Sequence, residues 1–323
     1  MGASTTSGRA VGAALGALAA TGAAAFAWGS LVERNSFTVR HETLPVLDPG
    51  ASPIRMLHLS DMHMAPWQRA KQEWVRSLAR LSPDFVVSTG DCFGHVDALE
   101  AIEYALEPLA GIPGVFVHGS NDYFGPTLKN PLSYLGGPSG HGGQPAHLDT
   151  AGLESFFDSL GWTDLNNAAF GATVKGSPLE FIGTGDAHRG WDRLELLPGA
   201  LDELREQAEP TDGPADREAV TIGVTHAPYQ RVLDSFVTHG TEVIFAGHTH
   251  GGQVCVPGIG ALVTNCDLPR DKASGLSLWR HALGSAFLNV SAGIGTSIYA
   301  PVRFACRPEA VLVTLTGTDI GYS

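Results

Sequence analysis

Short runs rich in β-branched and aromatic residues alternate with amphipathic helical patterns along most of this chain of 323 residues. Such alternation indicates a layered α/β architecture. The helical patterns, in which apolar residues recur three or four positions apart, span 68–80, 97–109, 195–207 and 229–239. The predicted strands are 54–59, 85–89, 115–118, 179–183, 220–225, 243–246, 286–291 and 310–315.

An uncharged run made mostly of Ala, Gly and Leu extends from residue 11 to residue 28. Its length suits a membrane-spanning helix, but Ala-rich segments are only weakly apolar. Three interpretations stay open: an uncleaved membrane anchor, which we favour, a cleaved signal segment, and a buried helix. Arg9 ahead of the run favours placing the rest of the chain outside the cytoplasm, whereas Arg34 and Arg40 beyond the run favour the opposite orientation.

These features divide the chain into three parts. Residues 1–40 form the apolar anchor or signal segment, residues 41–53 form a linker, and residues 54–317 form the folded domain. Within that domain, the stretch 125–147 is rich in Gly and Pro and too long for an ordinary connection, which predicts a surface loop near a functional face.

The charge of the chain disfavours one class of partner. Its 33 Asp and Glu residues outnumber its 20 Lys and Arg residues, and the net charge is -13. Proteins that bind nucleic acid through the phosphate backbone need the opposite sign. We therefore expect no nucleic-acid partner.

Residues of metal-binding type follow five of the predicted strands. Ligands of open α/β sheets bind outside the carboxyl ends of the strands, so these side chains are expected to meet at one edge. No single motif is specific, because 13 histidines produce H-x-H pairs by chance. The conjunction of all five predicts a metal site. The residues after the strands are Ser60-Asp61-Met62-His63, Gly90-Asp91, Gly119-Ser120-Asn121-Asp122, His226 and Gly247-His248-Thr249-His250.

The order D-x-H, G-D, a Gly-Asn motif, H and G-H-x-H resembles the calcineurin-like metallophosphoesterase superfamily. The stretches 247–253 (GHTHGGQ) and 293–303 (GIGTSIYAPVR) resemble its bacterial membrane-associated branch, the phosphodiesterases of YkuE and YaeI type. The resemblance covers about residues 54–315. It implies a metal-dependent phosphoric ester hydrolase with a four-layer α/β/β/α sandwich of mixed sheets, preceded here by the N-terminal apolar helix.

Carried over to this chain, the resemblance implies a site for two divalent metal ions. One ion is bound by Asp61, His63 and His250, the other by His226 and His248, and Asp91 bridges the two. Carboxylates and neutral imidazoles suit Mn, Fe or Zn, and Mg also fits. The resemblance further implies direct attack on phosphorus by a hydroxide held between the ions, so we expect no protein nucleophile.

One motif departs from the family pattern, because Gly119-Ser120-Asn121-Asp122 stands where the family has G-N-H-[DE]. Aligned without a gap, Asp122 takes the acidic position, while Ser120 and Asn121 replace the ligand Asn and the His. With a slip of one residue, Asn121 stays a metal ligand and Asp122 stands in the place of the His. We favour the slip, since an amide oxygen suits these cations better than a hydroxyl does.

In either alignment the family's His, which assists the transition state or the leaving group, is missing. General acid catalysis typically contributes about 10²- to 10⁴-fold, so the chain needs another donor or a good leaving group, such as a pyrophosphate or an aryl phosphate ester. His95 and His188 are candidate donors, and Arg303 and Arg307 are candidates for holding a phosphate. We expect substrate contacts from Arg303 and His95, and a part in catalysis for Asp91, Asn121, Asp122 and His248.

The sequence therefore predicts a phosphodiesterase or phosphomonoesterase that acts on a small or lipid-linked phosphate ester near a membrane. A nuclease or a protein phosphatase on the same metal core is one alternative, and the lack of a basic stripe argues against it. A non-catalytic metal-binding scaffold is the other. The altered motif at 119–122 favours that scaffold, whereas the six retained ligand residues argue against it.

Overall fold

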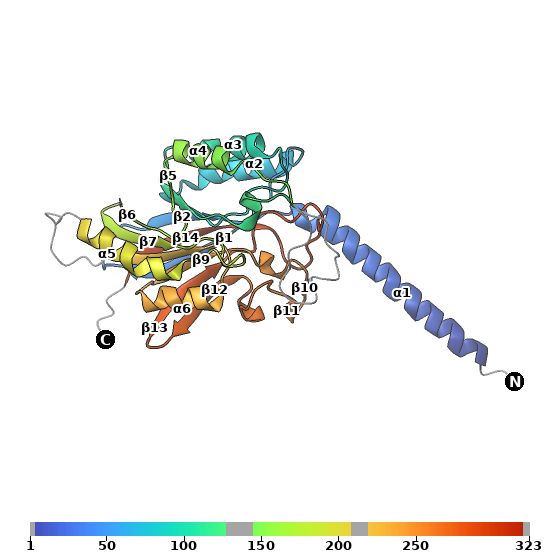
Figure 1. Cartoon of the computed structure of the whole chain (residues 1–323). Coiled ribbons are helices and arrows are strands. Elements are labelled where there is room, and N and C mark those ends of the chain that lie inside the picture. Colours follow the sequence, from blue (N-terminus) through green and yellow to red (C-terminus); the bar gives the residue numbers. More distant parts are fainter. Residues whose placement is uncertain (1–3, 127–144, 208–218, 319–323) are drawn as a thin grey trace.

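Two six-stranded sheets pack face to face in the computed structural model, which describes residues 4–126, 145–207 and 219–318 (Figure 1). The first sheet contains β1 (Thr38–Leu47), β2 (Ile54–Leu59), β3 (Phe85–Ser88), β4 (Gly114–Phe116), β5 (Trp162–Asp164) and β14 (Glu309–Gly317). The second contains β6 (Ala169–Val174), β7 (Ser177–Gly183), β8 (Val220–Thr225), β9 (Val243–Ala246), β12 (Gly275–His281) and β13 (Gly284–Val290). A small separate pair is formed by β10 (Cys255–Val256) and β11 (Gly260–Ala261).

Helices cover the outer faces of both sheets. Their bounds are α2 (Arg69–Ser77), α3 (Leu99–Leu106), α4 (Thr150–Leu160), α5 (Leu197–Gln207) and α6 (Gln230–Thr238). One apolar cluster joins the first sheet to α2, α3 and α4, and another joins the second sheet to α5 and α6. A third lies between the sheets, where the rings of Phe85 and Phe181 stack with centroids 4.7 Å apart. These layers confirm the predicted α/β/β/α sandwich.

Both sheets are mixed, as predicted. The first sheet has the order β1-β14-β2-β3-β4-β5, and its strands β2, β3, β4 and β5 run parallel. The second has the order β12-β13-β9-β8-β7-β6, and its strands β7, β8, β9 and β13 run parallel. Parallel neighbours end at the same edge of a sheet, so the turns that follow β2, β3, β8 and β9 come together.

All eight predicted strands are present, but the prediction of a linker over 41–53 was wrong for its first half. Residues 41–47 belong to β1, which pairs in parallel with β14 and buries Leu44 and Leu47. Pro45 argues against a strand at the level of the sequence, because proline is disfavoured inside sheets. It is tolerated here because β1 is the edge strand of its sheet. Of the predicted loop 125–147, residues 127–144 lie outside the described residues.

The apolar N-terminal run forms α1 (Ser4–Leu31), which extends away from the two sheets (Figure 1). The segment Gly12–Asn35 is long and apolar enough to cross a membrane, with a mean hydropathy of 1.5. Only 6% of its apolar window is buried. This exposure contradicts the alternative of a buried helix, and it leaves the anchor and the signal segment as interpretations.

Candidate metal centre

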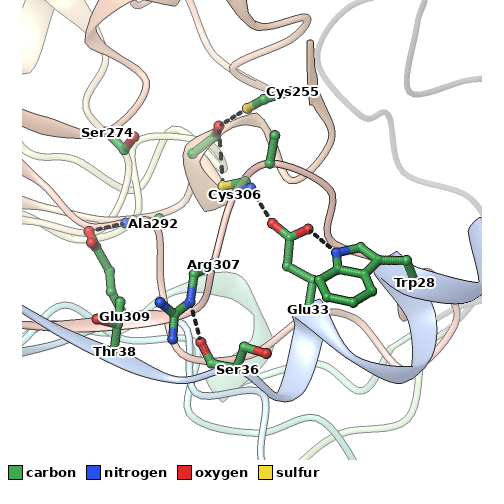
Figure 2. Close-up of a pocket in the computed structure, with 12 residues that line it drawn as sticks. Trp28, Glu33, Ser36, Thr38, Cys255, Ser274, Ala292, Cys306, Arg307 and Glu309 are labelled. Atoms are coloured by element: carbon green, nitrogen blue, oxygen red, sulfur yellow. Dashed lines mark hydrogen bonds between the residues drawn. The ribbon is translucent and has the colours of Figure 1, made fainter. Parts of the chain in front are cut away.

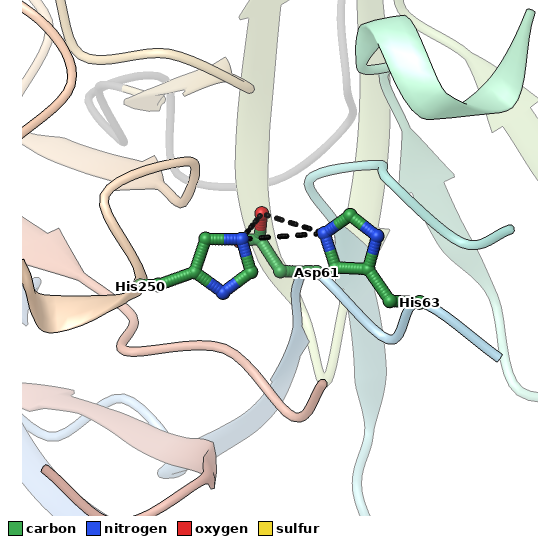
Figure 3. Close-up of side chains that lie close together, drawn as sticks. All are labelled: Asp61, His63 and His250. Atoms are coloured by element: carbon green, nitrogen blue, oxygen red, sulfur yellow. Dashed lines mark hydrogen bonds and ion pairs between the residues drawn. The ribbon is translucent and has the colours of Figure 1, made fainter. Parts of the chain in front are cut away.

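Side chains from two loops far apart in the sequence converge at the strand ends, as Figure 3 shows for Asp61 and His63 after β2 and His250 after β9. The Nε2 atoms of His63 and His250 lie 3.2 Å apart. Asp61 Oδ1 lies 3.5 Å from Nε2 of His250 and 4.0 Å from Nε2 of His63. The three ligand atoms therefore surround one point that could hold a metal ion.

A second group adjoins the first and consists of Asp61, Asp91 and His226. Asp91 Oδ2 lies 3.5 Å from His63 Nε2 and 3.6 Å from His226 Nε2, so this carboxylate stands between the two groups. His248 Nδ1 lies 3.3 Å from His226 Nε2. The structure thus brings six of the seven predicted ligand side chains, all except Asn121, into one buried cluster. Which ion each of them binds stays a prediction.

The chemistry of these donors fits divalent cations. His226 Nδ1 lies 2.7 Å from the carbonyl oxygen of Thr89, and the hydrogen bond to that carbonyl directs Nε2 of the ring toward the cluster. Asp61 Oδ1 is buried without a hydrogen-bond partner among the residues that the structure describes. Buried, unpaired acceptors are costly, and a cation at the point where they converge would satisfy them.

The pKa values of His226 and Asp91 also indicate that the cluster favours a positive charge. Burial alone would lower the pKa of His226, but the carboxylates of Asp91, Asp186 and Asp61 raise it to about 9. Burial would raise the pKa of Asp91, whereas the imidazoles of His226 and His63 and hydrogen bonds from Asn121 hold it below its usual range. The cluster therefore stabilises a cation next to Asp91, and a bound metal ion would supply that charge.

Strained backbone presents the candidate ligands. Left-handed φ angles are uncommon for residues other than glycine and cost about 1–3 kcal/mol each, and they concentrate at functional sites. Five of the six candidate ligands adopt them: Asp61 (49°), His63 (39°), Asp91 (55°), His248 (68°) and His250 (49°). No pattern in the sequence indicates this strain.

Two glycines allow the turns to approach one another closely. A Cβ atom on Gly119 would overlap Asp91 Oδ1 and would lie 2.7 Å from His226 Nε2. A Cβ atom on Gly247 would lie 2.5 Å from Asp61 Oδ2. The glycines of the predicted motifs therefore serve the packing of the site, because any side chain at these positions would displace a candidate ligand.

Asn121 contacts the cluster directly. Its backbone N–H donates to Asp91 Oδ1 at 2.8 Å, and its side-chain Nδ2 donates to Asp91 Oδ2 at 2.7 Å. Both hydrogen bonds orient the carboxylate that stands between the two groups. The predicted role of Asn121 as a metal ligand stays a prediction.

The contacts of Asp122 do not fit the predicted part in catalysis. Its carboxylate is fully buried, and Oδ2 accepts hydrogen bonds from the backbone N–H groups of Asp91 at 2.7 Å and Gly119 at 2.9 Å. Its Oδ1 accepts from Cys92 N at 2.7 Å. Asp122 therefore ties the turn after β3 to the turn after β4. The motif comparison could not distinguish this structural carboxylate from a catalytic one.

Of the two predicted substrate contacts, Arg303 has other partners in the structure, and the contact from His95 stays a prediction. Arg303 is fully buried, and its Nη2 donates to the carbonyl oxygens of Ala292, Gly293 and Gly295 at 2.6–3.0 Å, which does not fit binding of a phosphate. His95 lies partly exposed against the ring of Trp67, with centroids 5.0 Å apart. Of the other candidates, His188 packs with its ring centroid 4.5 Å from that of His248, and its role as a donor stays a prediction.

Arg307 lines a cavity of about 680 Å³ where the end of α1 meets the body (Figure 2). Its Nε donates to the carbonyl oxygen of Ser36 at 2.9 Å. Glu33 accepts hydrogen bonds from Trp28 Nε1 at 3.1 Å and from Cys306 N at 2.7 Å. These contacts join the end of α1 to the C-terminal part of the chain, and the role of Arg307 in holding a phosphate stays a prediction.

Comparison with known proteins agrees with this geometry. The sequence model of the family described as calcineurin-like phosphoesterase matches residues 54–252. The uncharacterized metallophosphoesterase YkuE of Bacillus subtilis is 22% identical over 296 residues, which cover 90% of this chain and 87% of YkuE. The phosphodiesterase YaeI of Escherichia coli is 24% identical over 282 residues, which cover 86% of this chain and 87% of YaeI. The UDP-2,3-diacylglucosamine pyrophosphatase LpxG of Chlamydia trachomatis is 23% identical over 311 residues, which cover 88% of this chain and 91% of LpxG.

Proposed function

The chain belongs to the calcineurin-like phosphoesterase family, and we propose that it hydrolyses a small or lipid-linked phosphate ester at a membrane surface. As a member of this family it is a metal-dependent phosphoester hydrolase that uses divalent metal ions. The observation that carries the proposal is the convergence of buried carboxylates and imidazoles at the strand ends. Their lone pairs meet at two adjoining points, as two metal ions require.

We assign the side chains in three sets: Asp61, His63 and His250 to one ion, His226 and His248 to the other, and Asp91 to both. Manganese, iron or zinc suits this mixture of imidazoles and carboxylates. Bound ions would supply Lewis-acid activation of the ester and of the attacking water. The chain itself holds the ligands in place through hydrogen bonds from Asn121 to Asp91 and from His226 to Thr89.

A membrane location is supported by α1 and by one relative. The exposed apolar helix is long enough to span a bilayer, and we propose that it anchors the chain with the body outside the cytoplasm. The name of LpxG describes a lipid-linked pyrophosphate as the substrate of that protein. In intact cells, protease added from outside should then cleave the body, and protection of the body from protease would refute this orientation.

Hydrolysis can be tested with the purified full chain in detergent. The substrates are 4-nitrophenyl phosphate and bis(4-nitrophenyl) phosphate, after chelation and after addition of Mn²⁺, Fe²⁺ or Zn²⁺. We expect metal-dependent turnover that Asp91→Asn lowers at least a hundredfold, because an amide is a weak bridging ligand. Asp97→Asn is the matched control, since the side chain of Asp97 is 79% exposed.

Two outcomes would overturn the proposal. One is full turnover in Asp91→Asn. The other is the absence of turnover on either ester while two ions remain bound, which would favour a non-catalytic scaffold. The preferred ester, where turnover is seen, decides between a monoesterase and a diesterase.

A further inference from the structure

A second pocket, of about 440 Å³, lies beside the candidate metal centre and is walled by aromatic side chains. The rings of Tyr123 and Trp191 meet edge to face, with centroids 5.2 Å apart and planes 85° apart. The ring of Phe124 lies 6.2 Å from that of Trp191. We call this site, lined by Tyr123, Phe124, Trp191 and Asp186, the aromatic pocket.

One tight turn connects the aromatic pocket to the metal centre. The carbonyl oxygen of Asp186 accepts hydrogen bonds from the N–H groups of Arg189 at 3.1 Å and Trp191 at 3.0 Å. Between these residues, the ring of His188 packs against the candidate ligand His248. Asp186 lines the pocket and is close enough to His226 and Asp91 to interact electrostatically with both. A substrate whose phosphorus lies at the metals therefore has the aromatic pocket within reach.

A positive charge accompanies the rings. The guanidinium carbon of Arg189 lies 5.5 Å from the ring centroid of Phe124 and 5.9 Å from that of Trp191. In the part of the chain that the structure describes, its Nε has no hydrogen-bond partner. Aromatic faces next to a guanidinium suit a flat ring that carries a phosphate, because the rings stack while the guanidinium binds the anion.

The aromatic pocket adjoins the motif in which the family carries the residue that assists the leaving group. Tyr123 follows directly after Asn121 and Asp122, where the family has the His that assists departure of the leaving group. Neither replacement is a proton donor: Asn121 is an amide, and the carboxylate of Asp122 is occupied by three backbone N–H groups. The reaction then favours a leaving group that departs as a stable anion without protonation.

We propose that the aromatic pocket binds the leaving group of the substrate, and that this group is a nucleoside monophosphate released from a phosphoanhydride. The inference rests on the proposed hydrolase function. Water forms the new bond to the phosphorus at the metals, and its protons pass to solvent. The bond from that phosphorus to the bridging oxygen breaks, and the oxygen leaves with its electron pair on the departing monophosphate. A phosphate monoester has a second pKa near 6, so it departs as an anion at neutral pH.

Binding can be measured independently of turnover, by calorimetry on the full chain in detergent with Mn²⁺. Adenosine 5′-monophosphate and ribose 5-phosphate differ only by the flat base. Stacking should make the nucleotide bind roughly 5- to 150-fold tighter than the sugar phosphate. Trp191→Leu should abolish this preference, while Trp67→Leu, which removes an exposed tryptophan elsewhere, should preserve it.

A second variant guards against misfolding of Trp191→Leu. Arg189→Gln leaves the rings in place and should weaken binding of both phosphates by a similar factor, so the preference for the nucleotide should persist. Equal binding of the two probes to the parent chain would overturn the proposal. Tighter binding of hexyl phosphate than of the nucleotide would also overturn it, because that result indicates a pocket for an acyl chain.

The two proposals can fail separately. Turnover of bis(4-nitrophenyl) phosphate without any preference for the nucleotide refutes the pocket and leaves the hydrolase standing. A clear preference that Trp191→Leu abolishes, without metal-dependent turnover of any ester, supports the pocket as a nucleotide site and refutes the hydrolase.

Discussion

Replacing Asp122 by Asn distinguishes a structural role from a catalytic role of this side chain, because the motif is consistent with both. In the structure its carboxylate is buried and accepts three backbone hydrogen bonds at 2.7–2.9 Å. Those N–H groups belong to Asp91, Cys92 and Gly119, which lie in the turns that form the metal centre. A structural role predicts a loss of stability, whereas a role as the catalytic acid predicts a loss of turnover in a stable protein.

The cost follows from the geometry of the three hydrogen bonds. If the Asn oxygen replaces Oδ2, it keeps the bonds from Asp91 and Gly119 in neutral form, and its NH₂ group meets Cys92 N–H. The lost charge-assisted bond costs about 1.5–3 kcal/mol, and the two weakened bonds add about 1 kcal/mol. We therefore expect a destabilisation of about 2.5–4 kcal/mol, which lowers Tm by about 5–16 °C at about 2–4 °C per kcal/mol.

Thermal unfolding in the presence of chelator measures this change without a contribution from bound metal. Asp149→Asn is the matched control, because the side chain of Asp149 accepts from Gly152 N at 3.0 Å at the exposed start of α4, where Asn caps a helix as well as Asp does. If Asp122→Asn melts within 2 °C of the parent, binds two ions and yet loses a hundredfold or more in turnover, the structural interpretation is refuted.

Two further predictions concern packing at the site and pH. Gly119→Ala should lower metal affinity at least tenfold in equilibrium dialysis, because the added methyl group overlaps Asp91 Oδ1; Gly199→Ala, whose Cβ would meet nothing within 4 Å, should not. Burial between the sheets lowers the pKa of His58 to about 3. His58 stays neutral in the fold but is protonated in the unfolded chain below pH 6.5, so its contribution is complete above pH 6.5 and is lost as the pH falls toward 3. In urea unfolding, the difference in stability between the parent and His58→Gln should change by about 1.4 kcal/mol per pH unit in that window.

Much of the metal centre could be predicted because two simple rules act together. Parallel strands end at one edge, and buried strands of four to six residues are easy to locate from their apolar runs. The residues that follow β2, β3, β8 and β9 were therefore expected to meet, and the distances around Asp91 show that they do. The family resemblance added the prediction of which side chains share an ion.

Features that depend on tertiary contacts could not be predicted from the sequence. The strand β1 carries a proline and only two fully buried leucines, so its pattern does not differ from that of a polar linker, and only its pairing with β14 makes it a strand. The aromatic pocket combines Tyr123 and Phe124 with Trp191, which lies more than sixty residues further along the chain. A single sequence shows no periodicity that links such residues.

Arg303 shows how a site residue can be identified correctly by position and wrongly by role. Its guanidinium holds the carbonyls of Ala292, Gly293 and Gly295, and this loop packs on the turn that carries Asp61. The N–H groups of Ile294 and Gly295 donate to the carbonyl oxygens of Ser60 and Asp61, at 3.0 Å and 2.6 Å. Arg303 thus affects the metal centre indirectly. It holds the backbone of the loop that packs against the strained turn carrying Asp61. An arginine that the sequence places near a phosphate site can therefore either contact the phosphate or be buried and hold backbone carbonyls. Only the burial of its side chain in the structure distinguishes the two.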